Sequence, residues 1–197
     1  MRELRGAVSD ERVLNAVRAV PRDRFVPEDL RAEAWDNAPL PIGCGQTISQ
    51  PLVVARMCEL LELEGGERVL DVGTGSGYHA ALLARLAAEV YSIELHAALS
   101  DRAARALAAA GAQNVTLAVG DGSQGLRAHA PYDAINVAAA ARRRVPDALI
   151  EQLAPGGRLV APIEERGDQY LALLREEGGT VRTTRLERVR FVPLVSR

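Results

Sequence analysis

The residues best placed to do chemistry are glycines that follow a short apolar run. Val69–Val72 is typical of a buried strand, and the alanine- and leucine-rich stretch Ala80–Ala88 is typical of a helix. Between them, glycine occupies alternate positions at Gly73, Gly75 and Gly77. Glycine permits positive φ and lets a ligand approach the backbone, while the N-terminus of the following helix offers unpaired N–H groups. The segment therefore predicts a cradle for a small polar nucleotide ligand.

The spacing of these glycines bears on which ligand is bound. A dinucleotide fingerprint, Gly-x-Gly-x-x-Gly, would need glycine where the chain has Tyr78, which weakens an NAD interpretation. The pattern instead resembles the first motif of Rossmann-like S-adenosylmethionine methyltransferases. The resemblance implies S-adenosylmethionine as cofactor and S-adenosylhomocysteine as product. It also implies cofactor contacts from the loop residues Asp71, Gly73, Thr74, Gly75, Ser76 and Gly77.

Two further acidic residues follow strand-like runs. Val90–Glu94 ends in a carboxylate close to the ~20-residue offset at which an acid binds ribose hydroxyls in this architecture. We expect Glu94 to bind the ribose and its neighbour Leu95 to be a further cofactor contact. A third run ends before Asp121 and Gly122, where methyltransferases of this class use an acid to accept a hydrogen bond from the adenine amino group. The alternative for each acid is a capping role at the next helix.

The arrangement of elements predicts the fold that positions these residues. Strand-like and helix-like segments alternate from Val69 to Pro162, which indicates a mainly parallel sheet. Tyr170–Arg175 and Val181–Val192 are strand-like and are joined by a hairpin signal at Gly178 and Gly179. We expect an α/β fold with a Rossmann-like, doubly wound sheet, helices on both faces and an antiparallel C-terminal edge.

The N-terminal third has a different pattern. Ser9–Val20 reads as a helix with Ser9 as N-cap, and an irregular, proline-bearing stretch follows it. Gln50–Leu63 reads as another helix, with Ser49 as N-cap and proline in its first turn. At 197 residues, the chain is expected to form a single domain, in which residues 1–65 are a helical and irregular extension on the substrate side.

A polar segment beside this second helix suggests the substrate. Gly45–Pro51 carries hydroxyl and amide side chains after a glycine. The chain resembles the protein-L-isoaspartate O-methyltransferase family from about Asp10 to Val195, and the resemblance depends on this segment together with Val20–Pro27, Ala34–Asn37, Leu40–Gly43 and Arg190–Val195. It implies methyl transfer from S-adenosylmethionine to the α-carboxylate of L-isoaspartyl residues in damaged proteins or peptides. The ester then closes to a succinimide, which initiates repair.

The same resemblance implies roles for individual residues. It places Ser49 and Thr47 beside the acceptor carboxylate as the catalytic pair, with Gln50 as a neighbour in the substrate site. The closing segment would supply main-chain contacts to an extended peptide through Val192, Pro193 and Leu194. A carboxylate is already ionised at neutral pH, so this reaction requires no strong general base.

Two departures from the family pattern lie at ends of predicted strands. Ala138–Ala141 replaces the usual Thr-Ala-Ala-Pro, and Ser123 replaces an aromatic residue. The following Arg142–Arg144 could bind an acidic peptide, or could be a solvated loop. Two other functions remain open: a related methyltransferase that esterifies aspartate in a dedicated peptide, and a non-catalytic S-adenosylmethionine-binding protein.

Composition limits the classes of partner. The net charge is −2 with 48% hydrophobic residues, and aromatic residues are few, so we expect no nucleic-acid partner. No apolar run of about 18 residues or N-terminal signal peptide is evident, which predicts a cytoplasmic protein without a membrane partner. The cysteines and histidines lack metal-ligand spacing, so no metal is expected. A monomer that acts on isoaspartyl proteins or peptides is the resulting expectation.

Overall fold

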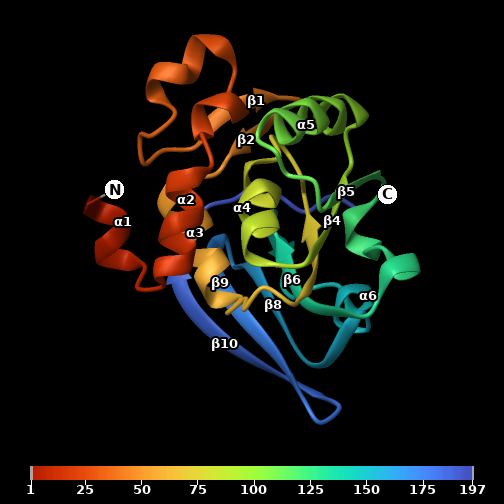
Figure 1. Cartoon of the computed structure of the whole chain (residues 1–197). Helices are drawn as coiled ribbons and strands as arrows, with labels where there is room; N and C mark the ends of the chain where they lie inside the picture. Colours follow the sequence, from red (N-terminus) through yellow and green to blue (C-terminus); the bar gives the residue numbers. More distant parts are fainter. Residues whose placement is uncertain (1, 197) are drawn as a thin grey trace.

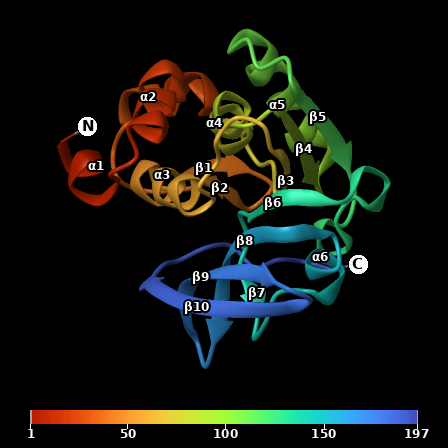
Figure 2. The same ribbon diagram turned by 60° about the horizontal axis from the view of Figure 1, so that its bottom comes forward.

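An eight-stranded sheet organises the computed structural model, which describes residues 2–196 (Figures 1 and 2). Seven strands form a continuous path in the order β10-β9-β8-β6-β3-β4-β5, and β7 (Ala141–Arg142) pairs with β8 beside that path. The bounds of the seven are β3 Arg68–Val72, β4 Glu89–Glu94, β5 Val115–Val119, β6 Tyr132–Val137, β8 Leu153–Glu165, β9 Asp168–Glu177 and β10 Thr180–Arg188.

The strand directions confirm the predicted topology. The strands from β5 to β8 along the path pair in parallel, whereas β9 and β10 add the antiparallel edge. Val72 at the end of β3 lies opposite both Ile93 of β4 and Val137 of β6. The chain runs outward from β3 to β5 and then returns to β6 on the other side of β3. Ligands bind in sheets of this type at such a switch point, outside the carboxyl ends of the strands.

Helices cover the two faces unequally. The bounds are α1 Arg2–Ala7, α2 Glu11–Ala19, α3 Pro51–Leu60, α4 Tyr78–Leu86, α5 Ala97–Ala109 and α6 Asp147–Ile150. The residues of α2 to α5 pack in one core cluster, whereas Leu149 of α6 belongs to the cluster on the other face. Helix α6 has only four residues, and β8 begins at Leu153. No helix within residues 2–196 is long and apolar enough to cross a membrane.

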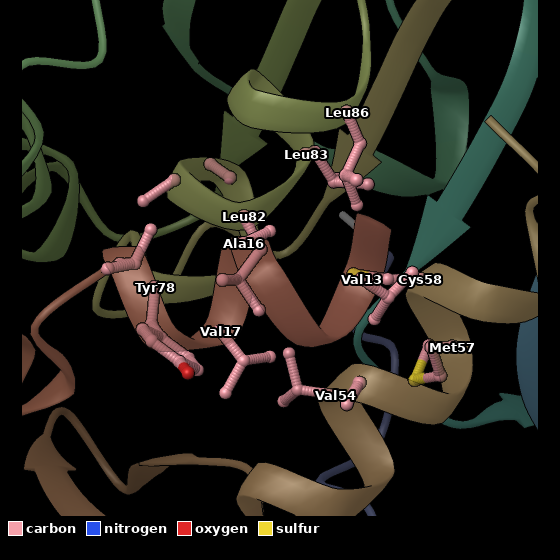
Figure 3. Close-up of a cluster of buried hydrophobic side chains, with 14 of the residues drawn as sticks. Val13, Ala16, Val17, Val54, Met57, Cys58, Tyr78, Leu82, Leu83 and Leu86 are labelled. Carbon is pink, nitrogen blue, oxygen red and sulfur yellow. The ribbon is translucent and has the colours of Figure 1, made fainter. Parts of the chain in front are cut away.

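The larger core joins the N-terminal helices to the sheet domain (Figure 3). Val17 of α2, Met57 of α3 and Leu82 of α4 are each fully buried at this junction. The same cluster includes sheet residues such as Val69 and Val90. Burial of a large aliphatic side chain stabilises the fold by about 1.5–3 kcal/mol. The N-terminal helices are therefore held by a core that is continuous with the sheet.

The predicted helix caps are wrong at both N-terminal sites. Asp10 caps α2, because its carboxylate accepts from the Arg12 N–H at 2.7 Å. Gln50 occupies the N-cap position of α3 without a side-chain hydrogen bond, so Ser49 does not cap that helix. The irregular stretch before it contains 3₁₀ turns at Arg22–Phe25 and Glu28–Glu33, and the hairpin strands β1 Leu40–Gly43 and β2 Gln46–Ile48.

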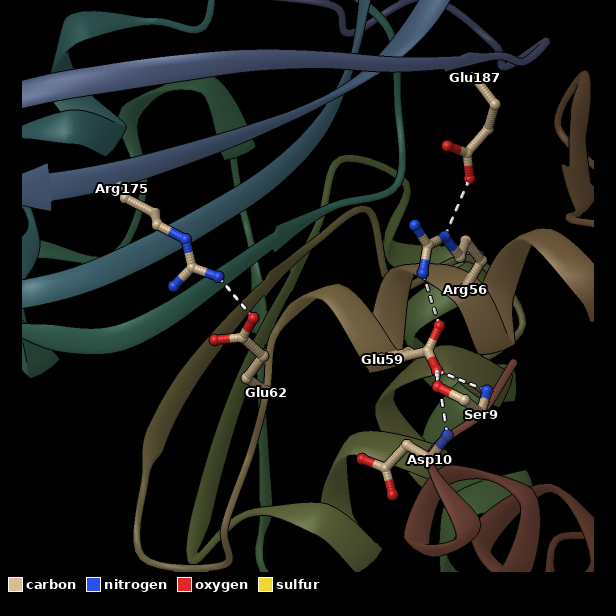
Figure 4. A network of polar contacts seen from close by, with 7 residues as sticks. All are labelled: Ser9, Asp10, Arg56, Glu59, Glu62, Arg175 and Glu187. Atoms are coloured by element: carbon tan, nitrogen blue, oxygen red, sulfur yellow. Dashed lines mark hydrogen bonds and ion pairs between the residues drawn. The ribbon is translucent and has the colours of Figure 1, made fainter. Parts of the chain in front are cut away.

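Ser9 instead binds Glu59 in a polar network between α2 and α3 (Figure 4). Glu59 Oε1 accepts from the backbone N–H groups of Ser9 and Asp10 at 2.6 and 3.0 Å, and from the Ser9 hydroxyl at 2.9 Å. Its Oε2 pairs with Arg56 at 2.6 Å, and Arg56 also reaches Glu187 on β10 at 3.2 Å. The network therefore links the N-terminal helices to the sheet edge.

We expect Glu59→Gln to lower the free energy of unfolding by about 1–3 kcal/mol at pH 7, because the amide leaves a donor without an acceptor. Burial favours a higher pKa for Glu59, but the hydrogen bonds from Ser9, Asp10 and Arg56 together outweigh it and lower that pKa. The stabilisation is therefore present above the ordinary glutamate pKa and is lost as the pH falls through the lowered value. Urea unfolding at pH 7 and pH 4 tests this: a wild-type advantage that stays constant or grows on acidification contradicts it.

Candidate active site

A cleft opens above the carboxyl ends of β3, β4 and β6. The empty space in it is about 820 Å³ with its open mouth included. Regions distant in the sequence form its walls: the hairpin segment, the glycine loop with the end of β4, the turn after β5, the residues after β6, and the C-terminal segment. The predicted site residues on these walls are Thr47, Ser49, Gly73, Thr74, Gly75, Ser76, Glu94, Leu95, Gly122, Val192, Pro193 and Leu194.

The glycine loop has the conformation that its sequence predicts. Gly73, Gly75 and Gly77 adopt φ values of +93°, +54° and +88°, which L-residues with side chains rarely adopt. The Gly73 N–H donates to the Ile93 carbonyl at 2.9 Å, and the Gly77 N–H donates to the Thr74 carbonyl at 2.8 Å. Gly77 is the N-cap of α4 and packs against α5, so it supports the loop from behind the cleft wall.

Glu94 holds the glycine loop from β4. Its Oε2 accepts from the Gly75 N–H at 2.8 Å, and its Oε1 accepts from the His96 N–H at 2.9 Å. Only 5% of Glu94 is exposed, and it lines the cleft. Each carboxylate oxygen has a second acceptor position, so Glu94 can also accept from ligand hydroxyls.

Asp71 lies beneath the loop rather than on the cleft wall. It is fully buried, and it accepts from Ser92 Oγ at 2.7 Å and from Asn136 Nδ2 at 2.7 Å. Ser92 Oγ lies 2.6 Å from Thr74 Oγ1, so the Thr74 hydroxyl donates to Ser92. Burial raises the pKa of Asp71 to about 6, although both hydrogen bonds oppose that shift. Asp71 therefore positions the loop through other side chains.

The turn that follows β5 supplies Gly122 to the cleft wall. A Cβ at Gly122 would lie 2.6 Å from Val72 Cγ1, so this position must be glycine for the segment to pack against β3. Asp121 precedes it and caps a 3₁₀ turn at Gly122–Gln124, where its carboxylate accepts from the Ser123 N–H at 2.9 Å. Asp121 itself is not part of the described cleft wall.

The β1–β2 hairpin brings the hydroxyl groups to the glycine loop. Arg102 of α5 donates to the Ile42 carbonyl at 2.6 Å, and Ile42 Cδ1 occupies the space beside Gly75. Ile48 of β2 is buried, and Thr47 and Ser49 flank it. Both residues line the cleft.

The C-terminal segment closes the other side of the cleft. It leaves the sheet after β10, which ends at Arg188 rather than at the expected Val192. The Ala140 N–H donates to the Val192 carbonyl at 2.8 Å, and the Leu194 N–H donates to the Ala140 carbonyl at 2.8 Å. Ala140, which matches the family pattern and lies between its two departures, therefore holds Val192–Leu194 in place by backbone contacts.

The remaining predicted positions lie away from the cleft. Gln50 is at the start of α3, behind the wall formed by its neighbour Ser49. Arg142 lies on β7, and Arg144 forms an exposed ion pair with Asp147 at 2.9 Å. The described wall includes no residue of the arginine run or Ser123, which favours the solvated-loop interpretation of Arg142–Arg144.

Several lining residues are absent from the predicted set. Gln46, Tyr78, His79 and His96 all contribute to the wall. His79 is buried, and its Nδ1 lies 3.2 Å from Nδ2 of Asn136. Asn136 is a polar residue inside the apolar run of β6, and a buried polar group requires a partner. This residue was therefore the signal in the sequence that another polar side chain, here His79, lies beside it.

Comparisons with known proteins agree with this geometry. The model of the protein-L-isoaspartate(D-aspartate) O-methyltransferase family matches residues 1–197. The chain is 53% identical to a protein-L-isoaspartate O-methyltransferase of Roseiflexus sp. (strain RS-1) over 95% of this chain and 86% of that protein. It is 55% identical to the protein of the same name from Anaeromyxobacter dehalogenans, over 95% and 90% of the two chains.

A solved structure shows the same architecture. The protein-L-isoaspartate O-methyltransferase structure from Plasmodium falciparum, in complex with S-adenosyl-L-homocysteine, matches with a TM-score of 0.86 and 27% identity. The match covers 97% of this chain and 93% of the other. The family model, the relatives and the shared architecture establish that this chain belongs to the protein-L-isoaspartate (D-aspartate) O-methyltransferase family.

Proposed function

We propose that the chain transfers a methyl group from S-adenosylmethionine to the α-carboxylate of L-isoaspartyl residues, and that Ser49 and Thr47 hold that carboxylate. One observation carries the assignment of roles: the hairpin hydroxyls line the same cleft as the glycine loop and Glu94. The family membership supports the reaction itself. The methyl ester then closes to a succinimide without further catalysis, and this opens the route to repair.

The cleft residues fit the cofactor. Positive-φ glycines leave backbone accessible at Gly73 and Gly75, and Glu94 retains acceptor capacity for ribose hydroxyls. We place the adenine near Gly122, with Asp121 as the acidic reader, and Ser76 and Leu95 as further contacts. When bound, S-adenosylmethionine supplies an electrophilic methyl group on a sulfonium centre.

The protein contributes positioning rather than proton transfer. The acceptor carboxylate is ionised at neutral pH and attacks as it is. Donation from Ser49 and Thr47 would orient one carboxylate oxygen and leave the other directed along the line of transfer. The segment Val192–Leu194 is paired with Ala140 on one edge, and its other backbone groups could bind an extended peptide. Exclusion of water by the peptide would strengthen these contacts.

A pair of peptides tests the reaction. One contains a single L-isoaspartate, and its control contains L-aspartate at the same position. Methylation of the first alone, with later methanol release, is the expected result. Equal methylation of both would favour a broader aspartate methyltransferase, and cofactor binding without any turnover would favour a binding protein.

Ser49→Ala is expected to reduce kcat/KM for the isoaspartyl peptide by about 10- to 100-fold, which is the cost of losing a hydrogen bond to a charged group. Binding of S-adenosylhomocysteine should remain unchanged, because Ser49 is assigned to the acceptor. Thr183→Ala removes an exposed hydroxyl from β10 and serves as the control. A Ser49→Ala enzyme with wild-type kcat/KM would remove Ser49 from the mechanism.

The proposal extends to the domain organisation, cellular location and oligomeric state of the chain. We infer one catalytic domain whose first 65 residues form the substrate side, since the hairpin in this part carries Thr47 and Ser49. We also infer a cytoplasmic monomer that binds no nucleic acid, in keeping with the net charge of −2. Light scattering after size-exclusion chromatography tests the oligomeric state.

A further inference from the structure

His79 is a buried polar residue of the cleft that has no role in the methyl transfer proposed above. It lies in the first turn of α4 and lines the cleft, with 7% of its surface exposed. Its Nε2 atom is buried and has no hydrogen-bond partner among the described residues. A buried donor without a partner costs about 1–3 kcal/mol. A ligand that displaces the side chains covering Nε2 and accepts a hydrogen bond from it therefore gains affinity.

The neighbours of His79 determine which ring nitrogen carries the proton. Asp71 Oδ1 accepts a hydrogen bond from Asn136 Nδ2 at 2.7 Å, which fixes the orientation of that amide. The same Nδ2 lies 3.2 Å from His79 Nδ1, and its second hydrogen can be donated there. Burial lowers the pKa of His79 to about 3, so the ring is neutral. With Nδ1 as acceptor, the single ring proton lies on Nε2.

The position of His79 determines the ligand group that it would contact. Residues in the first turn of a helix have backbone N–H groups without intrahelical partners, and helix N-termini favour anions. Helix α4 follows directly from the glycine loop, so its N-terminus belongs to the cofactor side of the cleft. The hydroxyls assigned to the acceptor carboxylate belong to the hairpin wall. An anion beside His79 is therefore a group of the cofactor.

We propose that His79 Nε2–H donates a hydrogen bond to the amino-acid carboxylate of S-adenosylmethionine and S-adenosylhomocysteine at the N-terminus of α4. This inference rests on the proposed cofactor site. Asn136 and Asp71 act as positioning residues, because they hold the ring in the tautomer that donates from Nε2. The buried chain from Thr74 through Ser92 to Asp71 thus connects the glycine loop with the carboxylate donor.

Calorimetry with two ligands tests the assignment. S-adenosylhomocysteine and its decarboxylated analogue differ only in the proposed partner of His79. We expect His79→Leu to weaken binding of the first by about 10- to 100-fold and to leave binding of the second within about twofold. His79→Gln retains a side-chain N–H donor and should recover most of the lost affinity. His129→Leu is the matched control, because His129 stacks on Tyr91 outside the described cleft wall.

Two outcomes would overturn the inference. Equal weakening of both ligands would show that His79 only supports packing. A raised KM for the peptide with unchanged binding of S-adenosylhomocysteine would assign His79 to the acceptor instead. Failure of the wild-type protein to bind S-adenosylhomocysteine would overturn the proposed cofactor site, and this result is distinct from any defect confined to the His79 variants.

A measurement on the wild-type protein keeps the inference testable if His79→Leu does not fold. The chain has three histidines, so ¹⁵N-histidine labelling gives a simple spectrum. The His79 Nε2–H resonance, assigned by its absence in His79→Gln, should shift with S-adenosylhomocysteine and much less with the decarboxylated analogue. The same shift with both ligands would contradict a contact with the carboxylate.

Discussion

Glu94→Ala is expected to weaken binding of S-adenosylhomocysteine by at least about 100-fold and to reduce kcat/KM by a similar factor. Two losses combine in this variant. The Gly75 and His96 N–H groups lose their shared acceptor, and the proposed ribose contacts disappear. Loss of two or more hydrogen bonds to a carboxylate, at about 1.5–3 kcal/mol each, accounts for this magnitude.

The Glu94→Gln variant tests whether ligand affinity depends on the charge of this side chain or only on its shape. Both oxygens of Glu94 accept from backbone N–H groups, so the glutamine NH₂ must face one of those donors. We therefore expect the glutamine variant to restore little of the affinity. Glu89→Ala, at the exposed start of the same strand, should bind like the wild type. Calorimetry measures the affinities, and an alanine variant within threefold of wild type would exclude Glu94 as the ribose contact.

The parts of this site that the sequence predicts are those determined locally. The apolar run before Gly73 predicts a buried parallel strand, and the glycines that follow it predict positive φ. Glu94 is similarly predictable, since the offset from the glycine loop is a property of the strand–helix–strand unit. Together these features are sufficient for the fold class and for the part of the cleft wall formed by the glycine loop and the end of β4.

The features that sequence could not predict depend on contacts between distant segments. The β1–β2 hairpin has three consecutive positive-φ residues, Gly43, Cys44 and Gly45, and only one of its flanking strands reads as apolar. Its position over Gly75 depends on Arg102, which is about 60 residues away. The Ser9 and Ser49 caps were predicted by residue type alone, and the structure uses a neighbouring residue in each case.

The association of Asp71, Asn136 and His79 shows the same limit. These residues belong to β3, β6 and α4, and they meet only because β3 and β6 pair in a fixed register that places Asp71 opposite Asn136. Asp71 had been expected to contact the cofactor, whereas its carboxylate lies within the buried chain below the loop.

We expect Asp71→Asn to raise the free energy of unfolding at pH 7.5 by on the order of 3 kcal/mol. Burial raises the pKa of Asp71 from 3.8 to about 6, and Glu94 adds a smaller contribution in the same direction. A shift of about two units costs the ionised native state roughly 3 kcal/mol. Asparagine has the same shape, and its NH₂ can donate to Ser92 while its carbonyl accepts from Asn136. The contacts with Asn136 and Ser92 are therefore retained without the charge, although the hydrogen bond with Ser92 is reversed and Ser92 then donates to Thr74.

The dependence on pH distinguishes this cause from better packing. Below pH 3.8, the Asp71 carboxyl group is protonated in both the native and the unfolded state, and the wild type carries no penalty. As the pH rises through 3.8 to about 6, the unfolded chain ionises first, so wild-type stability from this group is progressively lost. The advantage of the variant should therefore grow by on the order of 1 kcal/mol between pH 5 and pH 7.5.

Urea unfolding of the two proteins at both pH values measures this difference. Asp101→Asn removes an exposed carboxylate on α5 and corrects for the change in net charge. An advantage of the same size at pH 5 and pH 7.5 would mean that the carboxylate is not penalised by burial. Because the variant preserves the hydrogen bonds to Ser92 and Asn136, it should also bind S-adenosylhomocysteine like the wild type. Greater stability with unchanged affinity would show that the loop requires the shape of this side chain and not its charge.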